Sequence, residues 1–203
     1  MDNGVSRIEK AIAMFKKHGG ILRAAQAMRM GIHPATLYSM RDSGVLERVS
    51  RGMYRLAGSP PLGNPDLVIV AARVPGGVIC LISALSFHEL TTQIPHQVHV
   101  ALPNGAEEPR LDHPPLQTYR FSGTAFTEGV ETHEIDGVKV RIYSPEKTIA
   151  DCFKFRGRIG LDTAVEAIRY YHERQRIRVD RLMRYASICR VEKIIRPYLE
   201  AIL

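Results

Sequence analysis

The chain has 203 residues, of which 45% are hydrophobic, and a formal net charge of +7. This composition predicts a packed fold with one large core or two small domains.

No run of about 18 apolar residues occurs and the beginning, MDNGVSRIEKA, has no apolar signal segment, so we expect a cytoplasmic protein with no membrane partner. The three cysteines, Cys80, Cys152 and Cys189, are widely separated, which argues against a disulfide framework or a zinc knuckle.

The positive charge is concentrated at the two ends of the chain. Residues 1–60 carry ten Lys and Arg against four Asp and Glu, residues 61–130 carry three against six, and residues 131–203 carry fifteen against eleven. A basic N-terminal module is typical of nucleic-acid binding, because neutralising phosphates supplies most non-specific affinity. A basic surface that serves only solubility has the same composition, so charge alone leaves both interpretations open.

Two helices are expected first. Over Val5–His18 the apolar residues recur at the spacing of one helical face, and Gly19 and Gly20 end that pattern. Ile21–Met28 predicts a second, short helix whose alanines let a neighbouring helix approach closely. Gly31 then breaks the chain.

The next stretch, HPATLYSMRDSGVLERVSRGMYRL, combines a helix with a hairpin. Pro34 suits the first turn of a helix that Gly44 would end in the left-handed conformation. Val45–Val49 and Met53–Leu56 are typical of two strands, with Gly52 in the tight turn between them. Three helices followed by a two-stranded wing predict a winged helix-turn-helix, in which one helix enters the major groove and the hairpin contacts neighbouring backbone.

Candidate DNA contacts lie on the third helix and on the hairpin. Leu37 and Met40 would face the core, which turns the polar side chains of the helix outward toward base edges and phosphates. Arg51 would lie at the tip of the wing, where an arginine can follow phosphates or enter a narrow minor groove. The predicted DNA-binding residues are His33, Thr36, Tyr38, Ser39, Arg41, Arg48, Arg51 and Arg55. A three-helix domain that binds a protein instead is the alternative.

The segment Ala57–Pro65, AGSPPLGNP, has the composition of a linker. It separates a DNA-binding domain, residues 1–60, from a second domain, residues 66–203. The expected fold class is α+β, with the winged helix-turn-helix followed by a mixed domain of a small antiparallel sheet and several helices.

The second domain begins with predicted helices over Asp66–Arg73 and Val78–Leu90. Strands are predicted over Gln97–Leu102, Leu116–Phe121, Val130–Ile135 and Val138–Tyr143, and the Asp136-Gly137 pair between the last two indicates a hairpin in an antiparallel sheet. Ser144 is expected to cap the next helix, and three more follow over about Leu161–Arg174, Val179–Cys189 and Val191–Ile202.

Several polar patterns resemble catalytic or metal sites only in part. His96 and His99 are three apart on a predicted strand and would point to opposite faces, and His88 is interpreted as a hydrogen-bonded structural residue. Neither G-x-S-x-G nor a Walker-type or G-x-G-x-x-G motif occurs. We therefore predict no catalytic residues, no metal and no cofactor.

Two charged segments leave alternatives open. Glu131, Glu134 and Asp136 near Lys139 imitate the centre of a metal-dependent nuclease, but a solvated hairpin face is the simpler interpretation because these carboxylates do not converge on a strand. The arginine-rich segment His172–Arg184 forms either a second surface for a polyanion or partner, or a solvated helix pair with charge compensation.

Over most of its length the chain resembles the AbiEi-type antitoxins of bacterial toxin-antitoxin and abortive-infection systems. The resemblance rests on GGILRAAQAMRMGIHPATLYSMRDSGVLERVSRGMYRL, on ISALSFHEL followed by HQVHVALP, and on YSPEKTIADCFKFRGRIGLDTAVEAI. It implies a winged-helix domain that binds inverted repeats in its own promoter, and a C-terminal domain that counters a separately encoded nucleotidyltransferase-like toxin, with or without stable contact. It implies no enzyme activity. On matching positions it places DNA contacts at Thr36, Tyr38, Ser39, Arg41, Arg48 and Arg51.

Three functions follow from the sequence. The first is a DNA-binding antitoxin and transcriptional autorepressor that binds double-stranded DNA as a monomer or weak dimer. The second is a metal-dependent nuclease whose catalytic domain is residues 66–203 and whose N-terminal module only targets it. The third is an adaptor that docks a partner protein through its basic C-terminal helices.

Overall fold

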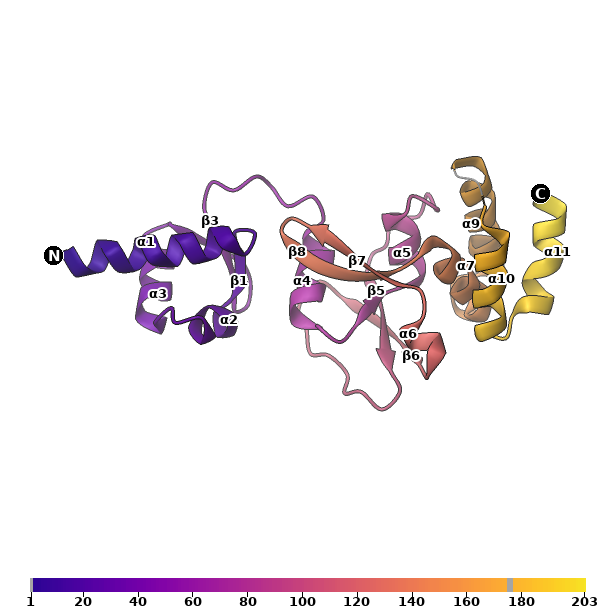
Figure 1. Ribbon diagram of the computed structural model, residues 1–203, viewed down its shortest axis with the longest axis horizontal. Helices are drawn as coiled ribbons and strands as arrows, with labels where there is room; N and C mark the ends of the chain where they lie inside the picture. Colours follow the sequence, from indigo (N-terminus) through magenta and orange to yellow (C-terminus); the bar gives the residue numbers. More distant parts are fainter. Residues whose placement is uncertain (1, 175–176) are drawn as a thin grey trace. The chain divides into compact units, whose positions relative to one another are not determined.

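The computed structural model describes residues 2–174 and 177–203, with the backbone alone for residues 2–6. The fold is α+β (Figure 1). The chain divides into two compact units, an N-terminal unit of residues up to Ala72 together with Glu134–Lys139, and a C-terminal unit of Arg73–His133 with Val140–Leu203. The side chain of Val5 and residues Gln175 and Arg176, which take part in the predictions above, lie outside the described part.

The N-terminal unit combines short helices with a three-stranded antiparallel sheet. Its elements are α1 (Asp2–Lys17), β1 (Ile21–Arg23), α2 (Ala24–Arg29), α3 (Pro34–Asp42), β2 (Leu46–Ser50) and β3 (Met53–Leu56), with the strands in the order β1-β3-β2. Helix α4 (Pro65–Arg73) follows the predicted linker. One hydrophobic core joins all three strands to α1, α2 and α3, with Phe15, Leu37 and Met40 fully buried in it.

The segment Ile21–Met28 differs from its prediction as a single helix. Ile21–Arg23 pairs antiparallel with β3, and only Ala24–Arg29 is helical. Gly19 and Gly20 have φ angles of 75° and 79°, a left-handed conformation that glycine adopts readily and that turns the chain out of α1 toward the hairpin. Pairing with a strand that comes much later in the chain is a long-range contact, which local periodicity does not encode.

A mixed five-stranded sheet follows α4 in the chain. Its strands are β4 (Val78–Ile79), β5 (Val98–Pro103), β6 (Leu116–Phe121), β7 (Val130–Ile135) and β8 (Val138–Tyr143), in the order β6-β5-β4-β8-β7. The sequence predicts an antiparallel sheet from four of them. β4 and β5 do pair antiparallel, but β5–β6 and β4–β8 are parallel, because longer connections such as residues 104–115 return the chain to run in the same direction.

The segment Val78–Leu90, predicted as one helix, contains a strand and a helix. Val78 and Ile79 form β4 between β5 and β8, and α5 (Leu81–Phe87) follows directly. A short apolar run is compatible with both a buried strand and a buried helix, so periodicity cannot separate them.

The remaining helices of the C-terminal unit follow in chain order. They are α6 (Thr124–Thr127), α7 (Pro145–Lys154), α8 (Arg156–Ile159), α9 (Leu161–Arg174), α10 (Val179–Ile188) and α11 (Glu192–Ile202). Figure 1 shows α7, α9, α10 and α11 at one end of the sheet, and α7 packs against α5, α9 and α10. The predicted cap of α7 is confirmed, because the Ser144 hydroxyl accepts a hydrogen bond from the backbone N–H of Lys147. The short helices α6 and α8 were not predicted.

Candidate nucleic-acid interface

Helix α3 has one buried and one exposed face. Its start is fixed by His33, whose Nδ1 accepts a hydrogen bond from the backbone N–H of Ala35 at 3.2 Å, and by Pro34 in the first turn. Leu37 and Met40 are fully buried, which confirms the predicted inward face. The opposite face is therefore presented to solvent.

The exposed face of α3 carries the polar residues predicted to contact DNA. Tyr38 is 41% exposed, Ser39 is exposed and Thr36 is half-buried. Arg41 forms an ion pair with Asp42 at 2.6 Å, and its guanidinium lies 5.2 Å from the centre of the Tyr38 ring. The hydrogen bond that Arg41 donates to the Asp42 carboxylate raises the pKa of Arg41. Because exposed ion pairs contribute little to stability, this guanidinium can exchange Asp42 for a phosphate.

The β2–β3 hairpin presents two further predicted residues. Gly52 has a φ of 70° in the turn, the left-handed conformation that the sequence predicts for it. Arg51 is exposed beside it. Arg48 is exposed on β2, where its Nε donates a hydrogen bond to the backbone oxygen of Ser50 at 3.4 Å across a bulge in the strand pairing. Both guanidinium groups therefore lie on the surface of the hairpin.

Arg55 is held by contacts within the protein. Its side chain on β3 is 20% exposed and pairs with Glu47, the residue opposite it on β2, at 2.8 Å. It also donates a hydrogen bond to the backbone oxygen of Pro60 at 3.2 Å. The structure thus gives Arg55 a role in joining the two strands, which sequence reasoning did not anticipate because the pairing depends on the register of the hairpin.

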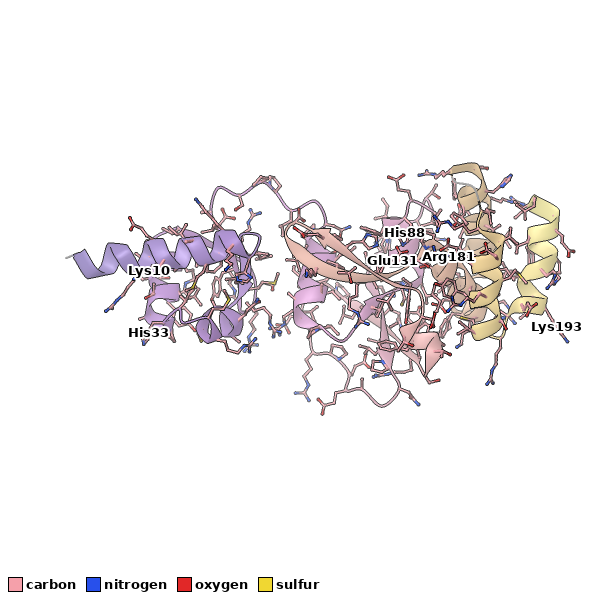
Figure 2. All side chains as sticks on the ribbon, in the orientation of Figure 1. Lys10, His33, His88, Glu131, Arg181 and Lys193 are labelled. Atoms are coloured by element: carbon pink, nitrogen blue, oxygen red, sulfur yellow. The ribbon has the colours of Figure 1, made fainter. Side chains whose placement is uncertain are left out.

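A hollow of about 360 Å³ lies between α1 and the start of α3. It is lined by Arg7, Lys10, Ala11, Met14, His33 and Thr36, among others. Figure 2 shows Lys10 on α1 and His33 at the start of α3 on the same side of the N-terminal unit. Arg7 and Lys10 are absent from the predicted site. The available signal was their position, three residues apart, on the polar face of the first helix.

His88 and His99 of the C-terminal unit have structural surroundings. His88 Nε2 lies 2.7 Å from the backbone oxygen of Tyr143, and burial lowers the pKa of this histidine. Its interpretation as a hydrogen-bonded residue is confirmed. On β5 and the segment before it, His96 is exposed whereas His99 is buried and stacks on Tyr119. Burial, aided by repulsion from Arg158, lowers the pKa of His99 to about 4.

The carboxylates of the β7–β8 hairpin do not converge. Glu131 is half-buried and approaches His133 at 3.4 Å, whereas Glu134 is exposed, and Asp136 lies in the turn. Within residues 2–174 and 177–203, no group of three or more His, Cys, Asp or Glu side chains is arranged to hold a metal ion.

The arginine-rich segment His172–Arg184 is largely compensated in its described part. Arg174 pairs with Glu89 at 2.6 Å and Arg184 with Glu128 at 2.8 Å. Arg181, labelled in Figure 2, lies 3.9 Å from the buried Glu146. These ion pairs favour the interpretation of a charge-compensated helix pair over a second polyanion surface.

No helix in the described part of the chain is long and apolar enough to cross a membrane.

The N-terminal segment is similar to a class of transcriptional regulators. Residues 9–57 match the family model described as "Transcriptional regulator, AbiEi antitoxin", which confirms the resemblance to AbiEi-type antitoxins over α2, α3, the hairpin and most of α1. No curated protein sequence matches the chain.

The whole fold resembles a solved structure, that of the RV2827C protein from Mycobacterium tuberculosis. The TM-score is 0.59 with 15% sequence identity, and the match covers 92% of this chain and 72% of that chain. At this identity the likeness shows the fold alone.

Proposed function

We propose that this protein is a DNA-binding antitoxin and transcriptional autorepressor of a toxin-antitoxin operon. The observation that carries the proposal is the match of residues 9–57 to an antitoxin family of transcriptional regulators. This matched segment contains both α3 and the hairpin, which present exposed cationic and polar side chains. In this proposal the protein has no enzymatic activity and acts in the cytoplasm.

We assign residues 1–60 as a winged helix-turn-helix and residues 66–203 as the antitoxin domain. In this arrangement α3 enters the major groove and the hairpin is the wing. Tyr38, Ser39 and Thr36 read base edges or adjacent sugars, since hydroxyl groups can contact either. His33 at the start of α3 and Arg41 near its end contact the flanking phosphates.

The three arginines of the hairpin have different proposed roles. Arg48 and Arg51 contact phosphates or the minor groove, because both lie on the exposed surface of the wing. Arg55 acts indirectly by fixing the two strands through Glu47. The target is double-stranded DNA containing the inverted repeats of the protein's own promoter, bound as a monomer or weak dimer.

A titration of the upstream promoter fragment against a scrambled duplex of equal length tests this function. Specific sites are typically bound ~10³-fold or more tightly than unrelated DNA at physiological salt. We expect a preference of this order for the promoter fragment. Equal affinity for both duplexes, or no binding even at low salt, would refute the proposed repressor.

The C-terminal unit is proposed to counter a separately encoded nucleotidyltransferase-like toxin. Co-expression tests this part: the full chain is expected to restore growth of cells that express the product of the neighbouring gene. If the chain represses its promoter but does not restore the growth of these cells, the protein is a transcriptional repressor without antitoxin activity.

A further inference from the structure

The hollow between α1 and α3 combines a cationic rim with an apolar floor. Arg7 and Lys10 are exposed on α1, and neither forms an ion pair with any side chain that the structure describes. Ala11, Met14 and Ile32 supply the apolar surface between them and α3. A site of this kind suits a ligand with an anionic and an apolar part.

The start of α3 adds to the positive potential of the hollow. His33 and Thr36 lie on its wall, and the N-terminal end of a helix carries a partial positive charge from its backbone dipoles. Because His33 Nδ1 accepts a hydrogen bond from Ala35, the proton of the neutral ring lies on Nε2, which is a donor. The hollow therefore offers two full charges, one hydrogen-bond donor and a favourable dipole.

We propose that this hollow binds one sugar–phosphate unit of the DNA backbone beside the groove that receives α3. Phosphate oxygens would meet Arg7 and Lys10, and the deoxyribose would lie on Ala11 and Met14. The inference rests on the proposed function. In this proposal α1 acts as a clamp on the DNA backbone. The clamp sets the position of the N-terminal unit along the duplex, since phosphate contacts fix register and orientation.

The dimensions of α3 favour a backbone segment over a free nucleotide. A helix of nine residues is about 14 Å long, close to the roughly 12 Å width of the major groove. When such a helix lies across the groove, its first residues reach one of the two flanking strands. His33 and Thr36, at the start of α3, also line the hollow. The hollow would therefore face a phosphate of the strand that these first residues reach.

Salt dependence gives the contact a measurable size. Each phosphate neutralised contributes about 0.9 to the slope of log affinity against log salt concentration. Raising the salt concentration from about 50 to 200 mM lowers the affinity of every variant. After the loss of one contact this fold-decrease in affinity is ~3.5 times smaller than for the wild type, and after the loss of two contacts it is ~12 times smaller.

The experiment compares four proteins on the promoter duplex across this salt range. They are the wild type, Arg7→Ala/Lys10→Ala, Lys10→Arg and Lys16→Ala. Lys16 is exposed on α1 but does not line the hollow, so its removal changes the net charge without changing the site. Circular dichroism checks that each variant is folded.

We expect the double variant to lose about two units of slope, Lys10→Arg to keep the wild-type slope, and Lys16→Ala to change it by much less than one unit. Equal slopes for Lys16→Ala and the double variant Arg7→Ala/Lys10→Ala would overturn the clamp while leaving the proposed repressor intact. A wild type that does not bind DNA at all would instead refute the proposed function.

A separate arm distinguishes DNA backbone from a free anion. Thymidine monophosphate at millimolar concentration is expected not to displace the duplex. If it binds saturably in a manner that requires Lys10, while the salt slope on DNA is unchanged by the double variant, the hollow is a small-molecule site and the proposal is wrong.

Discussion

The cationic side chains of the two units differ in their surroundings. In the N-terminal unit, Lys10 and Arg51 are exposed on the surface of α1 and of the hairpin. In the C-terminal unit, Lys147 has no exposed surface and pairs with Asp151, one turn along α7, while its ammonium lies 4.1 Å from the centre of the Tyr143 ring. The same kind of charge is thus exposed to solvent at Lys10 and Arg51 and buried in the core at Lys147.

This difference shows why the number of Lys and Arg alone could not identify the interface. The C-terminal residues 131–203 carry the larger number of Lys and Arg in the sequence. Many of them are matched by acids, as in the Arg174–Glu89 and Arg184–Glu128 pairs. What points to nucleic acid is the combination of exposure with a helix face and a hairpin.

The largest expected effect is on the buried pair of α7. Lys147→Met leaves the carboxylate of Asp151 buried without its partner, and breaking such a pair typically costs about 3–5 kcal/mol of the free energy of unfolding. Urea denaturation of the variant measures this loss. The double variant Lys147→Met/Asp151→Leu is expected to recover most of it, because both charges are then removed.

The pH dependence of the single variant sharpens the test. Burial raises the pKa of Asp151, and Lys147 opposes this rise. Without Lys147 the folded pKa rises further, so Lys147→Met should be least destabilising at acidic pH, where the carboxyl is neutral, and most destabilising near pH 7. A loss below 1 kcal/mol at pH 7 would contradict a structural role for this lysine.

His99 is expected to make the C-terminal unit sensitive to acid. Its folded pKa of about 4 lies below the ordinary value of 6.5, so the unfolded chain takes up a proton first as pH falls. The free energy of unfolding should therefore decrease between about pH 6.5 and 4, by at most ~1.4 kcal/mol per pH unit from this group. His99→Phe keeps an aromatic ring on Tyr119 and should flatten that slope.

The exposed His96 provides the matched control for this measurement. His96→Gln replaces an exposed histidine in place of the buried one and is compared with His99→Phe over the same pH range. Equal slopes for the His99→Phe variant and the wild type would show that burial of His99 does not govern acid stability.

Removal of an arginine at the β2–β3 turn should have a moderate effect on DNA binding. Arg51→Ala is expected to weaken binding to all duplexes alike and to reduce the salt slope by about one unit, as for the loss of one phosphate contact. Fluorescence anisotropy at several salt concentrations measures both quantities. A variant with wild-type affinity and slope would exclude the β2–β3 hairpin from the interface.

The smallest effect is expected for Arg55, which lies on the same hairpin. Arg55→Ala breaks the pair with Glu47 and should lower stability by roughly 0.2–1 kcal/mol, because the pair is only partly buried. Its salt slope on DNA should match that of the wild type. A loss of slope equal to that of Arg51→Ala would instead make Arg55 a direct phosphate contact.

Local signals in the sequence predicted the hairpins and the long helices. β3, β6, β7, β8 and α9 have the bounds that their periodicity and flanking turns predict. Gly52 and Asp136-Gly137 take the positive φ angles that tight turns need, and Ser144 caps α7 as expected. In each case the information lies within a few neighbouring residues.

Long-range contacts account for what the sequence could not predict. β1 and β4 are short strands that exist because they pair with partners distant in the chain. The parallel pairings of the second sheet have the same origin. For the candidate site, the exposed face of α3 followed from Leu37 and Met40, but the hollow beside Lys10 depends on how α1 packs against α3.

The central claim is that DNA binds the exposed cations of the N-terminal unit and not the cations of the C-terminal unit. A heteronuclear NMR titration of the full chain with the promoter duplex tests this claim residue by residue. We predict that the backbone amide shifts concentrate in α3, the β2–β3 turn and the start of α1. Shifts confined to α9 and α10, or none at saturating duplex, would contradict it.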